Sequence, residues 1–299
     1  GIVSVLKEEI GDMKEIVVVS GKGGTGKTTI VSCLSCAIPR KIIVDTDVDA
    51  ADMFILLTPE ILQQEEFTGG QSAVIDEEEC TGCGLCEKYC RFDAICRRED
   101  KYFVNPMKCE GCTLCSLVCP ERAITIVDEI VGKWFVSNTK HGKMVHARLN
   151  PGAENSGGLV ARVKEEAHTI AEEEDIPYIL VDGPPGIGCP VISALSGAQI
   201  AIVVTEPTIS GVHDLKRVWQ LCNNFDIETG VVVNKCDINK EKSEEIKSWC
   251  KQNKIEVLAE IPFTRCVDEA LMNKEIAYDV CPSIKEVIDK MWHKINATL

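Results

Sequence analysis

Residues 16–30 read IVVVSGKGGTGKTTI, and this stretch decides the fold of most of the chain. An apolar run ends at Ser20, the pattern GxxxxGK[ST] follows over 21–28, and a helical pattern begins at Lys27. A strand, a glycine-rich loop and a helix in this order are the context in which the pattern binds phosphates. In the pattern the lysine, here Lys27, reaches the β- and γ-phosphates, and the hydroxyl of Thr28 ligates Mg²⁺. The predicted nucleotide contacts are Gly21, Lys22, Gly23, Gly24, Thr25, Gly26, Lys27, Thr28 and Thr29.

Four further apolar runs, rich in valine and isoleucine, have the character of strands that are buried on both faces. They cover 42–46, 178–182, 200–205 and 230–234. Helical patterns alternate with the strands over 27–37, 158–174, 213–225 and 240–251. This alternation predicts an α/β domain with a doubly wound, mostly parallel sheet.

Acidic and amide residues stand at the carboxyl ends of the predicted strands. Asp45 and Asp47 end the second strand, Asp182 begins the sequence DGPPG that ends at Gly186, and Asn234 ends a later strand. In an open α/β sheet the carboxyl ends of the strands border the ligand crevice. We therefore expect these residues to face a bound nucleotide, with Asp45 and Asp182 supporting the Mg²⁺.

Cysteine replaces the aliphatic pattern between residues 71 and 131. The spacing Cys-x2-Cys-x2-Cys-x3-Cys begins at Cys80 and again at Cys109, 29 residues later. Such runs hold [4Fe–4S] clusters, and the fourth cysteine of each run ligates the cluster of the other run. Zinc is the alternative for a four-cysteine set, but its ligands usually come as separated pairs. The predicted sets are Cys80, Cys83, Cys86 and Cys119 for one cluster, and Cys109, Cys112, Cys115 and Cys90 for the other.

Together these motifs resemble the MinD/Mrp superfamily of P-loop ATPases, in the form that contains an inserted bacterial-type ferredoxin domain. Lys22 matches the additional lysine of the deviant Walker A signature of that superfamily. The resemblance implies that Lys22 crosses the interface of an ATP-sandwich homodimer to the nucleotide of the partner. It also implies that Asp47 orients the attacking water, that Gly186 gives its N–H to the γ-phosphate and that Asn234 faces the purine. The catalytic residues are then Lys22, Lys27, Asp47 and Asp182.

Two assignments depend on the resemblance or remain open: the identity of the base that Asn234 faces and the role of Cys189. Asn234–Asp237 has the pattern NKxD, which proteins that recognise guanine also contain. The assignment of adenine as the bound base therefore depends on the resemblance. Cys189 stands seven residues after Asp182, at the offset of a cluster ligand in the nitrogenase iron protein, but no second cysteine accompanies it near residue 154. We interpret Cys189 as a buried structural cysteine, with a labile metal or partner contact as the alternative.

The remaining cysteines show no ligand pattern. Cys33 and Cys36 lie three apart on the helix after the glycine-rich loop and have the character of small core residues. The C-terminal CxxC of Mrp-type proteins is absent, because Cys250, Cys266 and Cys281 are dispersed. The five histidines show no ligand spacing either.

Composition limits the partners and the compartment. The formal net charge of −15 repels phosphate backbones, so nucleic acid is not an expected partner. Seventeen cysteines without a secretory signal favour metal ligation in a reducing compartment. The apolar runs are too short for a transmembrane span, and we expect the last helix, 284–295, to pack on the sheet rather than on a membrane. We expect a cytoplasmic protein, and Met13 is a candidate for its native start.

The expected domains are the first part of a P-loop ATPase domain over 13–70, a ferredoxin-like insert over 71–131 and the second part of the ATPase domain over 132–299. The expected function is an ATP-hydrolysing iron–sulfur protein, stimulated by a partner. The nucleotide state of its dimer is coupled to electron transfer or to the docking of a client metalloprotein. One alternative is an iron–sulfur carrier or scaffold of Mrp type. The other is a MinD-like positioning protein that uses the clusters for redox sensing.

Overall fold

The computed structural model describes residues 13–48, 52–153 and 155–298, so the segment before Met13 lies outside the described residues. The chain divides into two compact units. The first contains the chain up to Gln64, Trp134–Arg148 and the chain from Ser156 onward. The second contains Glu65–Lys133 and Leu149–Asn155. The second unit includes the whole stretch 71–131, in which cysteine is frequent. It begins six residues before that stretch, at Glu65, and also contains the later segment Leu149–Asn155.

The first unit is organised around a sheet with the strand order β11-β10-β9-β1-β8-β2-β7-β6-β3, of which β3 and β6 lie partly in the second unit. All paired neighbours from β11 to β7 are parallel, as expected for a doubly wound sheet. The runs of valine and isoleucine therefore mark strands that are buried on both faces. The bounds are β1 Lys14–Ser20, β2 Lys41–Asp45, β3 Glu60–Ile75, β6 Ile124–Thr139, β7 Gly142–Leu149, β8 Tyr178–Pro185, β9 Ile200–Thr205, β10 Glu228–Asn234 and β11 Glu256–Ile261.

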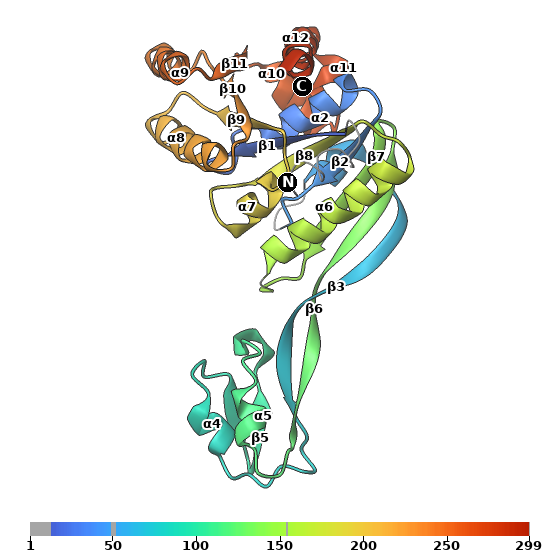
Figure 1. Cartoon of the computed structure of the whole chain (residues 1–299), viewed down its shortest axis with the longest axis vertical. Coiled ribbons are helices and arrows are strands. Elements are labelled where there is room, and N and C mark those ends of the chain that lie inside the picture. Colours follow the sequence, from blue (N-terminus) through green and yellow to red (C-terminus); the bar gives the residue numbers. More distant parts are fainter. Residues whose placement is uncertain (1–12, 49–51, 154, 299) are drawn as a thin grey trace, which may run out of the picture. The chain divides into compact units, whose positions relative to one another are not determined.

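Helices cover both faces of this sheet (Figure 1). On one face lie α2 (Lys27–Ala37), α10 (Arg265–Met272), α11 (Ala277–Val280) and α12 (Pro282–Thr298). On the other lie α6 (Ser156–Glu173), α7 (Cys189–Leu195) and α8 (Ile209–Asn224). The short α3 (Met53–Leu57) packs on α2, and α9 (Lys240–Gln252) packs on α8, β10 and β11.

The apolar stripe of α12 lies in the main core, as the sequence analysis expected. Ile284, Ile288, Met291 and Ile295 are each at most 4% exposed and belong to the same buried cluster as Leu34 of α2. The stripe therefore stabilises the first unit. Within the described residues, no helix has the length and apolar character needed to cross a lipid bilayer.

The second unit repeats its own backbone. It contains α4 (Leu85–Tyr89), α5 (Leu114–Val118), the hairpin of β4 (Ile95–Arg98) with β5 (Lys101–Val104), and a single 3-10 turn, η1 (Pro106–Lys108). Positive φ angles recur 29 residues apart, at Asp93 (50°) and Arg122 (54°). Gly84 (78°) and Thr113 (65°) recur in the same way, each directly before a short helix. The sequence repeat is thus also a structural repeat.

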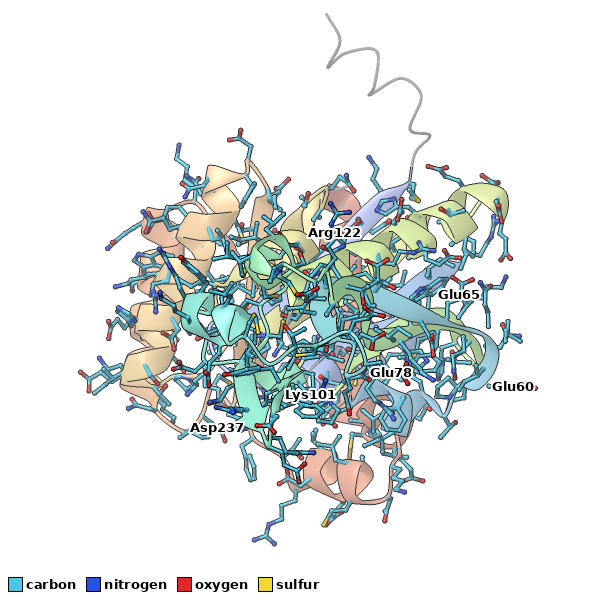
Figure 2. All side chains as sticks on the ribbon, turned by 90° about the horizontal axis from the view of Figure 1, so that it is seen from below. Glu60, Glu65, Glu78, Lys101, Arg122 and Asp237 are labelled. Carbon is cyan, nitrogen blue, oxygen red and sulfur yellow. A yellow bond between two sulfur atoms is a disulfide. The ribbon has the colours of Figure 1, made fainter. Side chains whose placement is uncertain are left out.

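Strand β3 begins on the surface. Residues 60–66 are all exposed, and the side chains of Glu60 and Glu65 project away from the ribbon (Figure 2). Ile61 and Leu62 are about half exposed, at 54% and 53%. Because no face of this segment is buried, its sequence lacks the apolar pattern of a strand, and the sequence analysis did not predict one there.

One disulfide bond joins elements that are adjacent in the chain. Cys266, at the start of α10, is bonded to Cys281, which follows α11, with 6.0 Å between their Cα atoms. The sequence analysis left these two cysteines unpaired. The bond closes a segment of 15 residues and restrains α10 against the start of α12.

His146 of β7 makes the stability of the first unit sensitive to acid. Its ring is 7% exposed, stacks on Phe135 and lies 3.1 Å from Ser137 Oγ through Nε2. Burial, with a smaller contribution from Arg148, lowers the pKa of His146 from 6.5 to about 4. As the pH falls below 6.5, His146 takes up a proton in the unfolded chain but stays neutral in the folded chain until the pH approaches 4. The free energy of unfolding should therefore fall by up to about 3 kcal/mol between pH 6.5 and pH 4.

Denaturant titrations followed by tryptophan fluorescence measure this effect, because all four tryptophans lie in the first unit. His146→Gln should lose most of the dependence between pH 6.5 and pH 4. His213→Gln, at an exposed position, should keep it. An unchanged acid dependence in His146→Gln would show that other groups cause it.

Candidate functional site

The glycine-rich loop connects β1 to α2 and has the geometry of a phosphate cradle. Gly24 and Gly26 have φ angles of 75° and 92°, and Gly26 is the N-cap of α2. A Cβ atom at Gly26 would lie 2.5 Å from Asn234 Nδ2, so a larger residue fits neither the backbone nor the space. The first N–H groups of α2 have no partner within the helix and favour an anion.

A cavity of about 610 Å³ opens beside this loop. Its lining includes glycines of the loop, Lys27, Thr28 and Asp47. Lys235, Asp268 and Leu271 also line it, and the sequence analysis predicted none of these three. The cavity thus combines polar groups that suit phosphates with apolar groups that suit a base.

Two buried carboxyl groups face each other across neighbouring strands. Asp45 of β2 and Asp182 of β8 are directly paired in the sheet register, and each is 1% exposed. Thr28 Oγ1 donates to Asp182 Oδ2 over 2.7 Å, and the N–H of Asp47 donates to Asp45 Oδ1 over 3.1 Å. Asp45 Oδ2 and Asp182 Oδ1 are buried without a hydrogen-bond partner among the described residues.

These orphaned oxygens fit a divalent cation. A buried carboxylate oxygen without a partner is costly, and Mg²⁺ is commonly held by one or two carboxylates together with phosphate oxygens. Burial raises the pKa of Asp45 well above its usual range, and the neighbouring Asp182 adds to the shift. Burial also raises the pKa of Asp182 to about 7, against the lowering effect of Thr28 and Lys27. A cation bound here would reverse both shifts, because it stabilises the ionised carboxylates.

Lys22 is held by acidic and polar groups of its own chain. Its Nζ lies 3.6 Å from Glu206 Oε2 and donates to Ser210 Oγ over 3.4 Å. The other oxygen of Glu206 accepts from Lys235 Nζ over 2.7 Å. Sequence reasoning missed Glu206, although it directly follows the carboxyl end of β9, the position that identified Asp45 and Asp182.

Three other predicted residues also have partners within the chain. Asn234 Nδ2 donates to the carbonyl of Thr25 over 2.8 Å, so Asn234 supports the phosphate loop, and purine recognition by it stays a prediction. The N–H of Gly186 donates to the carbonyl of Ser20 over 2.8 Å, so a γ-phosphate contact would require this bond to open. Asp47 lines the cavity near the loop, and its role in orienting water stays a prediction.

The eight motif cysteines line two separate cavities in the second unit. Cys80, Cys83, Cys86 and Cys119 line one, here called the first cysteine cavity. Cys90, Cys109, Cys112 and Cys115 line the other, the second cysteine cavity. Each cavity therefore combines the first three cysteines of one run with the last cysteine of the other.

The walls of the cysteine cavities suit a buried inorganic group. All eight cysteines are free thiols. Ile75 and Ile124 contribute apolar wall to the first cavity, and Ala73 and Ile95 to the second. Four thiols in an apolar pocket form a donor set for a thiolate-ligated metal group. Zinc in each four-cysteine set remains the alternative to an iron–sulfur cluster.

Cys189 is exposed at the start of α7, so the expectation of a buried structural cysteine is wrong. The residue directly follows the loop after β8, and that loop lies on the surface. The prediction rested on the general tendency of free cysteines to be buried, which does not hold at this surface position.

Comparison with known proteins places the first unit among nucleotide-binding domains. The family model described as CobQ/CobB/MinD/ParA nucleotide binding domain matches residues 16–277. An uncharacterized protein of Methanocaldococcus jannaschii is 28% identical over 290 residues, which cover 96% of this chain and 98% of the relative. The septum site-determining protein MinD of Synechocystis is 25% identical over 226 residues, or 74% of this chain and 64% of that protein.

Solved structures show the same fold. The cell division ATPase MinD of Pyrococcus furiosus aligns with a TM-score of 0.56 and 20% identity, covering 96% of this chain and 99% of that one. MinD of Pyrococcus horikoshii, solved in complex with Mg-ADP, aligns with a TM-score of 0.56 and 19% identity, covering 95% and 96%. At these identities the likeness establishes the α/β fold with its mostly parallel sheet.

Proposed function

Because the chain belongs to the CobQ/CobB/MinD/ParA nucleotide-binding family, we propose that it is a magnesium-dependent ATPase with two [4Fe–4S] clusters. In this proposal the nucleotide state of a homodimer controls electron transfer or the docking of a client metalloprotein. The observation that carries the proposal is the division of eight cysteines into two cavities of four, in a chain whose other unit contains a phosphate cradle.

The nucleotide chemistry follows from the residues around the 610 Å³ cavity. The N–H groups of the glycine-rich loop and Lys27 bind the phosphates and stabilise the charge that develops on the γ-phosphate. Thr28 and Asp182 would hold the magnesium, Asp45 would support it from β2, and the ion would supply positive charge to the phosphates. Asp47, which lines the same cavity, orients the attacking water. The similar MinD of Pyrococcus horikoshii was solved in complex with Mg-ADP, and this supports the choice of an adenine nucleotide and magnesium.

The two cysteine cavities support the iron–sulfur part of the proposal. Cys119 joins the first cavity and Cys90 joins the second, as crossed ligation requires. Because each cluster is bound by both runs, metal binding stabilises the small fold of the second unit. Its apolar core is small, with Ala73, Ile95 and Ile124 among the buried members. Bound clusters supply one-electron redox chemistry.

The dimer part of the proposal depends on Lys22. In the single chain Lys22 is paired with Glu206, and ATP from a partner would compete with this pair for the lysine. Lys22→Ala should weaken ATP-dependent dimerisation by at least about 30-fold, because a charged partner of the phosphates is lost at the interface. Binding of ATP to the single chain should change little. Sedimentation with MgATP and nucleotide titrations measure the two quantities.

Lys251→Ala, at an exposed position on α9, serves as the control and should leave both quantities unchanged. A Lys22→Ala variant that dimerises with ATP like the parent chain would remove the support for the sandwich dimer. The ATPase and cluster parts of the proposal would stand in that case.

Relatives named septum site-determining protein MinD raise a second candidate, a positioning protein with redox sensing. The apolar stripe of α12 is buried in the core, so this helix has no apolar face left for a lipid surface. Complete four-cysteine sets likewise favour retained clusters over a carrier, because a transferable cluster needs open or labile ligation. We therefore place electron transfer or client docking first.

One experiment distinguishes the three functions. The anaerobically prepared chain is incubated with MgATP, a reductant and three targets in parallel: a redox-active metalloprotein acceptor, an apo-ferredoxin and anionic liposomes. Nucleotide-dependent reduction of the acceptor supports the proposal. Loss of iron to the apo-ferredoxin supports the carrier, and ATP-dependent sedimentation with the liposomes supports the positioning protein.

A further inference from the structure

Three potential metal ligands from three separate elements meet at the C-terminal end of α2. Cys36 belongs to α2, His141 to the turn between β6 and β7, and Asp279 to α11. Their ligand atoms all lie within 4.8 Å of one another. None of the three lines the nucleotide cavity or either cysteine cavity. We propose that this cluster is a site for a zinc-like divalent cation, held by Cys36, His141 and Asp279, with water in the fourth position.

The distance between the two softer ligands supports tetrahedral coordination. Cys36 Sγ lies 3.7 Å from His141 Nε2. Bonds of about 2.3 Å to sulfur and about 2.0 Å to nitrogen at a tetrahedral angle place the two ligand atoms about 3.5 Å apart. A cation can therefore be bound between them with almost no rearrangement. A carboxylate oxygen of Asp279 lies within 4.8 Å of both ligand atoms and would complete the set by moving toward the ion.

The donor types favour a borderline-soft cation. A thiolate, an imidazole and a carboxylate are all ligands of Zn²⁺, whereas Mg²⁺ and Ca²⁺ select oxygen. Cys36 and His141 are partly buried and Asp279 is exposed, so the site is open to solvent on one side. That opening provides an entry path for the ion and room for a water ligand.

The surrounding backbone holds the ligands in place. Thr139 Oγ1 accepts from the N–H of His141 over 3.0 Å and donates to the carbonyl of Gly142 over 2.8 Å, which fixes the turn. The disulfide at Cys281, two residues after Asp279, restrains the end of α11. The site is thus assembled before an ion binds, which lowers the cost of binding.

Two lysines lie near the ligands. Lys140 Nζ is 2.9 Å from Asp279 Oδ2, and both side chains are largely exposed, so this ion pair contributes little and can open. Lys41, which is 7% exposed, also interacts electrostatically with Cys36. When the cation binds, the thiol of Cys36 loses its proton to solvent and Asp279 exchanges Lys140 for the metal.

The test is a metal titration of the full chain, prepared anaerobically with its cysteine cavities filled. Zn²⁺ is added after chelator treatment, and bound zinc is counted together with iron and sulfide. The parent chain should bind one equivalent of zinc, and Cys36→Ala and His141→Ala should each bind it at least about 100-fold more weakly, because loss of a direct ligand should cost no less than loss of an outer-shell partner. Co²⁺ in place of Zn²⁺ should give a thiolate-to-cobalt absorption band that Cys36→Ala lacks.

Matched controls are Cys222→Ala and His213→Ala, which lie on α8 away from the cluster and should keep the extra equivalent. Circular dichroism verifies that each variant is folded. The proposal is overturned if the parent chain takes up no additional zinc, or if folded Cys36→Ala and His141→Ala bind it as tightly as the parent. The cluster is then held by the thiol–imidazole contact and the ion pair of Asp279 with Lys140, without a metal ion. The comparison between variants is valid whatever fills the cysteine cavities, so it is independent of the proposed function.

Discussion

Replacing Lys27 with alanine is expected to lower ATP turnover by at least about 1,000-fold while the iron content stays unchanged. Lys27 is 5% exposed, lines the nucleotide cavity and begins α2 at the phosphate loop. In the GxxxxGK[ST] pattern this lysine reaches the β- and γ-phosphates, so its loss removes transition-state stabilisation. Phosphate release, iron and acid-labile sulfide are measured on the same anaerobic sample.

Lys251→Ala is the control for a lost lysine on the surface and should keep full turnover. Turnover within tenfold of the parent in Lys27→Ala would contradict the assignment of the phosphate site. Loss of iron from a folded Lys27→Ala variant would instead contradict the independence of the two units, because Lys27 belongs to the first unit and all eight motif cysteines belong to the second.

Replacing Cys119 with alanine is expected to remove one cluster, the one bound with Cys80, and to reduce iron from about eight to about four atoms per chain. Cys119 lines the first cysteine cavity although it belongs to the second run. The double variant Cys80→Ala with Cys119→Ala should therefore lose no more iron than either single variant. The double variant Cys109→Ala with Cys119→Ala should lose both clusters, because it affects both cavities.

Cys96→Ala is the matched control, since Cys96 lies in the same unit, is a free exposed thiol and lines neither cavity. It should keep the full iron content. If the pair Cys109 and Cys119 instead behaves as one site, each run binds its own cluster and crossed ligation is wrong. Zinc in place of iron in the anaerobic parent chain would contradict the cluster assignment itself.

Most of the sheet was predictable because its strands are buried on both faces. The runs of valine and isoleucine at 16–20 and 200–205 have no other stable location than the middle of a covered parallel sheet. Strand β11 was missed, because Glu256 at its start and Glu260 near its end are exposed and interrupt the apolar run. The exposed start of β3 was missed for the same reason. Its backbone pairing in the sheet defines it as a strand, whereas its side chains show no apolar pattern.

The candidate site was predictable where residues act in short sequence patterns. The phosphate loop and the cysteine runs are local in the chain, so their spacing encodes their geometry. Contacts between separate elements carry no such signal. Glu206 with Lys22, Cys36 with His141 and Cys266 with Cys281 come together only through folding, with chain separations of 184, 105 and 15 residues. The return of Leu149–Asn155 to the second unit is of the same kind.

An EPR-monitored redox titration of the anaerobic full chain, with and without MgATP, tests most directly whether nucleotide binding acts on iron–sulfur clusters in one molecule. We expect signals of two [4Fe–4S] clusters whose midpoint potentials or line shapes change on addition of MgATP, and no such change in Lys27→Ala. A chain without cluster signals, or with titrations that are identical in the presence and absence of MgATP, would contradict the account.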